Sequence, residues 1–282
     1  MPLDSAANRR DILLFLAGAM ALAAGARPSE AGEARIERLI AKARGLEQIS
    51  QRIDFISGAL RGTRYQGYTL IGGPRRPEKF VVRDDAFDCV TFCETVLAAA
   101  LARGTAEFAT TLREIRYRNG IVNWFERNHY FFEWCQHNVA NKTCRWIGMD
   151  GAVDIEKTVD SQKGLSKRRF SMRVIPRAVF LAHKAMLQSG DIVGFVSRRS
   201  NLDYFHAGFV AFARDRTLLL RHASESRHRV LDERMDRFVA HNRVRYVTLL
   251  RPEQPAAAVA VKKVFDHRQA AAALPFGFTS AL

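Results

Sequence analysis

The chain has 282 residues, of which 48% are hydrophobic, and carries a formal net charge of +15. This length suits one domain with a sizeable core, and the charge favours an anionic partner without specifying which one. No helix-turn-helix, zinc-finger or aromatic ribonucleoprotein motif occurs, so we do not expect nucleic acid to be the partner. The four cysteines include no Cys-x-x-Cys pair and no histidine-rich cluster accompanies them, so we predict no metal site and no cofactor.

Residues 1–31 have the features of an export signal. Arg9 and Arg10 precede an apolar run over 12–26 that is rich in alanine and glycine. This run is shorter than the roughly 20 residues needed to span a bilayer. The paired arginines are similar to a twin-arginine signal, with a Sec signal as the alternative. No cysteine precedes Cys89, which argues against a lipid anchor. We therefore expect a periplasmic protein with no stable membrane anchor.

The mature chain is predicted to divide into a domain over 32–252 and an alanine-rich tail over 253–282. Its first part, 34–58, has hydrophobic residues at helical spacing and is predicted to form one helix. A loop that contains Tyr65 follows this helix.

The segment that begins at Cys89 is predicted to be an amphipathic helix. Apolar residues recur at the i, i+4, i+7 and i+8 positions of one face, and Gly104 suits the helix end. Asp88 then occupies the N-cap position. The free N–H groups and the positive end of the helix dipole favour a thiolate, which lowers a cysteine pKa from about 8.5. Cys89 is therefore a candidate nucleophile, and the alternative is a buried structural cysteine.

The middle of the chain is rich in aromatic and basic residues. The span 117–134 packs seven aromatic residues and His129 closely together, which suits either a core or a substrate groove. Cys135 and Cys144 flank a turn-like segment and are candidates for a local disulfide. The stretch 157–177 carries several lysines and arginines and is predicted to be a solvated basic insertion, with the lining of a groove for an acidic ligand as the alternative.

Three short apolar runs, at 190–196, 203–212 and 218–224, predict an antiparallel meander. Neighbouring strands of such a meander bring His206 and His222 side by side. A cysteine nucleophile needs a general base and a group that orients that base. Cys89, His206 and His222 can fill these roles in order, although each histidine alone also suits a strand end.

Several short motifs between Ile53 and Pro252 occur in a characteristic order. They are Asp88-Cys89-Val90-Thr91-Phe92, Tyr117-Arg118-Asn119-Gly120, Arg127-Asn128-His129-Tyr130 with Trp134, Gly190-Asp191-Ile192-Val193, Leu202-Asp203 before His206-Ala207-Gly208, and His222-Ala223-Ser224. Taken together they resemble the DUF1460 branch of the NlpC/P60 superfamily of papain-like cell-wall peptidases, whose members are N-acetylmuramoyl-L-alanine amidases.

The resemblance implies an α+β papain-like fold in which the nucleophile helix packs on a central antiparallel sheet. It also implies that Cys89 is the nucleophile, His206 the base and His222 the orienting residue. The remaining residues that it points to are candidates for substrate binding. These are Tyr65, Asp88, Arg127, His129, Tyr130 and Asp203.

The activity implied is hydrolysis of the amide between N-acetylmuramic acid, or its anhydro form, and L-alanine. The substrate would be peptidoglycan or released muropeptides, and Arg127 would suit a stem carboxylate because its guanidinium binds in a forked geometry. Two alternatives stay open: an endopeptidase that cuts between D-glutamate and the diamino acid, and a catalytically silent wall-binding module. We expect a monomer.

Overall fold

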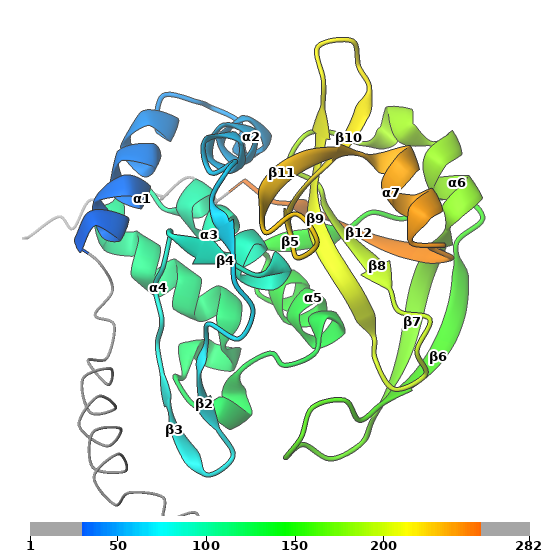
Figure 1. Ribbon diagram of the computed structural model, residues 1–282, viewed down its shortest axis with the longest axis horizontal. Coiled ribbons are helices and arrows are strands. Elements are labelled where there is room, and N and C mark those ends of the chain that lie inside the picture. The colour runs from blue at the N-terminus through cyan, green and yellow to red at the C-terminus, as the bar shows by residue number, and fades with distance from the viewer. Residues whose placement is uncertain (1–29, 255–282) are drawn as a thin grey trace, which may run out of the picture.

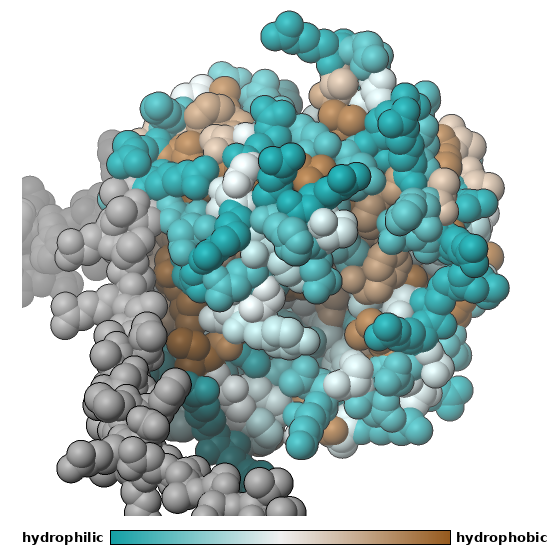
Figure 2. Space-filling model, in the orientation of Figure 1, coloured by the Kyte–Doolittle hydropathy of each residue, from teal (hydrophilic) through white to brown (hydrophobic). Residues whose placement is uncertain are grey.

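The computed structural model describes residues 30–254, which form an α+β fold with helices packed against a curled sheet (Figure 1). The predicted export signal and C-terminal tail lie outside the described residues, except for 30–31 and 253–254. Within 30–254, no helix combines the length and apolar character needed to cross a membrane. Figure 2 shows that one face of the molecule is covered mainly by hydrophilic residues, as expected for a chain with a net charge of +15.

Most helices belong to the first half of the described chain, and the strands of the main sheet belong mostly to the second half. The helices are α1 (Glu30–Ala43), α2 (Ile49–Ala59), α3 (Cys89–Leu101), α4 (Thr105–Arg116), α5 (Phe131–Ala140), α6 (Arg177–Ala182) and α7 (Met235–His241), with short 3-10 turns η1 (Arg118–Gly120), η2 (Trp124–Glu126) and η3 (Lys184–Met186).

The main sheet has the order β4-β1-β11-β10-β9-β8-β12-β7-β6, with β5 paired to β12, and β2 and β3 form a separate hairpin. The strands are β1 (Arg64–Tyr65), β2 (Ile71–Gly73), β3 (Arg76–Lys79), β4 (Ala86–Phe87), β5 (Cys144–Trp146), β6 (Val153–Val159), β7 (Arg168–Pro176), β8 (Ile192–Val196), β9 (Tyr204–Phe212), β10 (Leu218–Ser224), β11 (Arg229–Arg234) and β12 (Tyr246–Pro252).

The predicted meander and the helix that begins at Cys89 are both confirmed. Strands β8, β9 and β10 pair antiparallel in sequence order, and α3 starts at Cys89 with Asp88 as its N-cap. Helix α3 packs on β9, where the rings of Phe92 and Phe209 lie 5.7 Å apart. Its apolar residues bury against the sheet, so the start of α3 is fixed next to β9.

The sheet separates two hydrophobic cores. The face covered by α3, which we call the helical face, buries Phe92, Ala207 and Phe209 among residues of α1, α2 and α5. The opposite face buries Phe195 and Val210 together with residues of α6 and α7. Because side chains alternate along a strand, the two faces are supplied by alternate residues of β9.

The prediction of one helix over 34–58 is wrong, because the chain breaks into α1 and α2. The break is stabilised by a new N-terminus, where Gln48 caps α2 and the side chain of Gln51 accepts the Gln48 N–H at 3.3 Å. Reciprocal bonds of this kind satisfy N–H groups that have no partner inside the helix.

The predicted basic insertion at 157–177 is exposed to solvent, as predicted, at Lys163, Lys167, Arg169 and Arg173. It includes the end of β6 and all of β7, and β6 pairs antiparallel with residues 168–174 of β7. Cys135 and Cys144 are both free thiols buried in the core, so the structure contains no local disulfide between them.

Candidate active site

Cys89 is the first residue of α3, and the cap around it is tightly bonded. The Asp88 carboxylate accepts the N–H groups of Val90 at 3.0 Å and Thr91 at 2.7 Å, and the Thr91 hydroxyl accepts the Asp88 N–H at 2.9 Å. Asp88 satisfies two of the N–H groups that a helix start leaves without intrahelical partners. These bonds fix the residue at which α3 begins, and so the place of Cys89 at its first position.

Cys89 lines a cavity of about 1090 Å³. Five of the residues predicted from the sequence meet there: Tyr65, Asp88, Cys89, Arg127 and His129. They come from β1, from the start of α3 and from the segment before α5, which are far apart in the chain. The remaining lining residues include Tyr68, Gly72, Pro74, Arg75, Arg76, Glu94, Trp124, Asn128, Gln162, Lys163 and Glu225.

The thiol of Cys89 does not have the lowered pKa that the helix start predicts. Burial and, second to it, the charge of Asp88 raise the pKa of Cys89 to about 12, although the backbone N–H groups of Ala207, Cys89 and Val90 act in the opposite direction. Desolvation of the charged form therefore outweighs the helix terminus. At neutral pH Cys89 is a protonated thiol in the resting protein.

Arg127 reaches the cavity but is not a free cation. Its Nη1 donates to Glu78 Oε1 at 3.0 Å, and the Tyr117 hydroxyl donates to the same oxygen at 2.8 Å. The Glu78 side chain is only 1% exposed, so this pair is mostly screened from solvent. The charge of Arg127 is thus already balanced, which leaves less for a substrate carboxylate than the sequence suggests.

His129 lies in the cavity as a neutral imidazole. Its Nε2 is 2.6 Å from the Trp124 carbonyl oxygen, and because a carbonyl only accepts, Nε2 carries the proton and Nδ1 is left as the basic nitrogen. Burial lowers the pKa of His129 to about 4. The ring also packs on Trp124, with centroids 4.4 Å apart.

His206 and His222 form a direct pair, as the meander predicts. His206 Nε2 lies 2.6 Å from His222 Nδ1, and His222 Nε2 lies 3.4 Å from Glu233 Oε2. Burial lowers the pKa of His206 to about 3 and that of His222 to about 4. Both imidazoles are therefore neutral at pH 7.

This pair lies on the sheet face opposite Cys89. His206 and His222 each pack 5.4 Å from the ring of Phe238 on α7, whereas Ala207, the neighbour of His206, faces α3. Among the described residues, no hydrogen bond joins the Cys89 thiol to either imidazole. The structure thus brings the two histidines together but does not bring them to Cys89.

A bulge in β9 sets the face on which His206 lies. His206 pairs with Phe195 and Tyr204 pairs with Val196, so Phe205 is an extra residue opposite β8. Tyr204 consequently belongs to the helical face and His206 to the other. In a regular strand these two residues would share a face.

The last two predicted site residues are part of the core. Tyr130 is 2% exposed and packs on Phe170 with ring centroids 5.7 Å apart. The buried Asp203 carboxylate accepts the Phe132 N–H at 2.8 Å, which satisfies the N-terminus of α5. Neither residue lines the cavity that contains Cys89.

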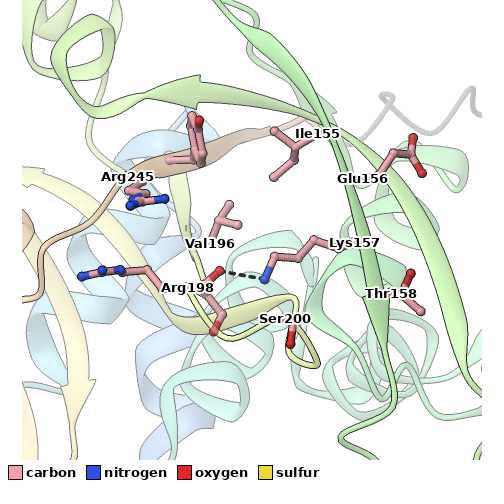
Figure 3. A pocket seen from close by; sticks show the side chains of 10 residues that line it. Ile155, Glu156, Lys157, Thr158, Val196, Arg198, Ser200 and Arg245 are labelled. Carbon is pink, nitrogen blue, oxygen red and sulfur yellow. Dashed lines mark hydrogen bonds between the residues drawn. The ribbon is translucent and has the colours of Figure 1, made fainter.

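A second cavity, of about 410 Å³, lies between β6 and the loop from β8 to β9 (Figure 3). Lys157 extends into this region and donates to the Ser197 carbonyl at 2.7 Å (Figure 3). Arg198 and Arg245 line its rim and make no ion pair within residues 30–254. Neither histidine of the pair nor Cys89 lines this cavity.

Sequence reasoning missed four charged residues of the Cys89 cavity. Arg75 lies in the turn between β2 and β3, Arg76 begins β3, Glu94 lies on α3 and Glu225 follows β10. The short run Gly73-Pro74-Arg75-Arg76 carries a turn signal that predicts a hairpin. Nothing local indicates that this hairpin faces Cys89.

Within residues 30–254, no group of three or more His, Cys, Asp or Glu side chains is arranged to hold a metal ion.

The comparisons with known proteins give a family model for most of the chain and solved structures with a similar fold. A family model described as AmiA-like, N-acetylmuramoyl-L-alanine amidase-like, matches residues 55–246. A Legionella pneumophila protein of the DUF1460 family has a similar structure, with a TM-score of 0.69 and 20% identity over 79% of this chain and 95% of that one. An N-acetylmuramoyl-L-alanine amidase from Bacteroides uniformis gives 0.65 and 23%, over 74% of this chain and 100% of that one. No curated protein matches.

Proposed function

The chain belongs to the N-acetylmuramoyl-L-alanine amidase-like family, and from this premise we propose that it hydrolyses the amide between N-acetylmuramic acid and L-alanine with Cys89 as nucleophile. The observation that carries the proposal is the position of Cys89. It begins α3 and lines the large cavity, whereas the other three cysteines are buried in the core. The substrate is peptidoglycan or a muropeptide released from it.

In the proposed reaction the Cys89 sulfur attacks the lactyl carbonyl carbon and gives its proton to a base. The carbonyl oxygen gains negative charge, which the Cys89 N–H at the start of α3 stabilises together with a neighbouring donor. The base then protonates the L-alanine nitrogen, the C–N bond breaks, and a thioester remains on Cys89. Water, deprotonated by the same base, attacks the thioester and releases the carboxylate of the sugar lactyl group.

The resemblance assigns the base to His206 and its orientation to His222, and we retain this as part of the proposal. The pair is neutral and bonded, as a base and its orienting partner must be. The Ala207 N–H beside the sulfur shows that β9 passes Cys89 next to His206. Moving the bulge one residue toward the C-terminus would turn His206 to the helical face. We propose that substrate binding favours this arrangement.

A second candidate function is a wall-binding module without catalysis. The observations that favour it are the high pKa of Cys89 and the absence, among the described residues, of a bond from its thiol to an imidazole. A binding module has no need of a reactive thiol. The two functions differ in whether the protein changes its ligand.

The deciding experiment incubates the protein with defined muropeptides and identifies the products by mass spectrometry. We expect a free peptide that begins with L-alanine, and no such product from Cys89→Ala. A cut after D-glutamate would instead support the endopeptidase, and an unchanged substrate that still binds would support the module.

The same assay tests the base. We expect His206→Gln to lower kcat by about 10²-fold or more, whereas His129→Gln, which alters the histidine in the cavity, should mainly raise KM. The reverse result would move the role of base to His129.

The cellular location is also a proposal. The paired arginines and the apolar run at 12–26 support export to the periplasm, where peptidoglycan is found. Placement in the papain-like NlpC/P60 superfamily is supported by the order of Cys89, His206 and His222 in the sequence.

A further inference from the structure

Two segments far apart in the sequence touch across the Cys89 cavity. They are the β2–β3 turn, with Pro74 at its tip, and the loop between β6 and β7, which contains Gly164; Figure 1 shows both at the lower edge of the molecule. A Cβ atom at Gly164 would lie 2.4 Å from Pro74 Cγ and 3.2 Å from the Trp124 ring. Gly164 also has a φ of +93°, so a side chain there would be strained as well as crowded.

Each of these segments brings positive charge to the cavity. Arg75 and Arg76 come from the turn and Lys163 from the loop, and all three line the cavity and are exposed. Within residues 30–254 none of the three makes an ion pair or a side-chain hydrogen bond. Their charges are therefore available to a ligand.

The acidic residues of the cavity are either engaged or close to Tyr65. The carboxylate of Asp88 caps α3, and that of Glu94 accepts from Arg116 at 2.7 Å in a pair whose side chains are each 3% exposed. Glu225 is exposed, and burial followed by the charges of Glu225 and Asp88 raises the pKa of Tyr65. The cavity is thus acidic near Tyr65 and basic near the turn and loop.

We infer that Arg75, Arg76 and Lys163 form a cationic bridge over the cavity that binds the free carboxylates of the stem peptide. The identity of this ligand rests on the proposed function. Guanidinium groups bind carboxylates through two parallel hydrogen bonds, which fixes orientation as well as affinity. The acidic end near Tyr65 repels carboxylates, so the stem extends toward the bridge and the sugar toward Tyr65.

The test measures binding by calorimetry in a Cys89→Ala background, so that no ligand is consumed. The probes are the stem peptide L-Ala-D-Glu-diamino acid with free carboxylates and the same peptide with its carboxylates amidated. We expect the acidic peptide to bind more tightly. We expect three single variants, Arg75→Gln, Arg76→Gln and Lys163→Gln, to raise the Kd of the acidic peptide about threefold to fivefold each. The Kd of the amidated peptide should stay nearly unchanged.

Two matched controls isolate the bridge. Arg198→Gln and Arg245→Gln remove unpaired arginines of the second cavity and should leave both Kd values unchanged. Gly164→Ala should weaken the acidic peptide without removing a charge, because the added Cβ separates the turn from the loop. Gly62→Ala introduces the same backbone strain, at a φ of +86°, but has no atom within 4 Å and should not affect binding.

Equal affinity for the two peptides, absence of binding by either, or equal losses in the control variants would overturn the bridge. The outcome is separable from that of the proposed function. If the unmutated protein cleaves no muropeptide but charge-selective binding persists, the amidase proposal fails and the bridge stands. If cleavage occurs but the Gln variants bind normally, only the bridge fails.

Discussion

The thiol of Cys89 illustrates how two local effects compete at one residue. The start of α3 surrounds the sulfur with backbone N–H groups that stabilise a thiolate, but the protein around it removes water, which stabilises the thiol. Loss of hydration is the larger effect, as is usual for a charge moved from water into a protein interior. The thiol of Cys89 consequently stays protonated until a base accepts its proton.

Alkylation of Cys89 tests this resting state. Because the pKa of Cys89 is raised to about 12, the thiolate fraction rises about tenfold per pH unit below that value. We expect the rate with iodoacetamide to be slow at pH 7 and to keep rising through pH 10, with Cys89→Ala as the control for the labelled site. A rate that levels off near pH 6 would instead show a thiolate paired with a protonated imidazole.

The buried histidines make stability depend on pH. The pKa values of His129, His206 and His222 are about 4, 3 and 4 in the folded protein, and return to about 6.5 on unfolding. Below pH 6.5 the unfolded chain therefore binds more protons, and the free energy of unfolding falls as the pH is lowered toward 4. Each histidine adds a slope of up to about 1.4 kcal/mol per pH unit.

Urea unfolding at pH 7, 6 and 5 measures this slope. A variant with His206→Gln and His222→Gln should show a flatter dependence than the unmutated protein. A stability independent of pH over this range would contradict the neutral, buried state of these histidines.

At the scale of elements, the position of Cys89 depends on the start of α3. The Asp88 carboxylate accepts two backbone N–H groups there, so the helix begins at Cys89 and not one residue earlier or later. A shift of one residue would rotate the thiol by about 100° around the helix axis, away from the cavity.

We expect Asp88→Ala to lower the free energy of unfolding by about 1–2 kcal/mol, because the cap is lost. Asp88→Asn keeps an acceptor and should retain most of the stability. It also removes a charge that raises the pKa of Cys89, so alkylation should be faster at a given pH. Equal stability of the two variants in urea would show that the cap contributes little.

At the scale of the whole molecule, the sheet connects the parts that form the site. Strands β6 and β7 pair beside β12, at the opposite end of the sheet from β1 and β4. Lys157 on β6 joins this end to the β8–β9 loop, where its Nζ donates to the carbonyls of Ser197, Arg199 and Leu202 at 2.7, 2.6 and 2.7 Å. That loop leads into β9 and its bulge.

Removing the hydrogen bonds of Lys157 should loosen the β8–β9 loop. We expect Lys157→Met to lower the free energy of unfolding by about 1–3 kcal/mol, because the three carbonyls lose their donor. Amide hydrogen exchange over 197–203 should become faster. Lys167→Met, at an exposed position of the neighbouring loop, should stay within about 0.5 kcal/mol. Unchanged exchange in the Lys157 variant would show that the loop is held by other contacts.

Much of the fold was predictable because its signals are local. Helical periodicity after Asp88 gave α3 and its first residue, and alternating apolar runs gave β8, β9 and β10. The pairing of His206 with His222 followed from the meander. The break between α1 and α2 was missed because their apolar faces continue across it, so periodicity alone shows one helix.

The sequence by itself determined where α3 starts and where the strands of the meander run, because capping and periodicity depend on near neighbours. Only the tertiary structure decided where these residues face. A single bulge placed His206 on the sheet face that points away from Cys89. Burial raised the pKa of the thiol, which the helix start was expected to lower. A contact between Pro74 and Gly164 brought basic residues to the cavity. These outcomes depend on strand register, on desolvation and on the meeting of distant segments, which neighbouring residues in the chain do not encode.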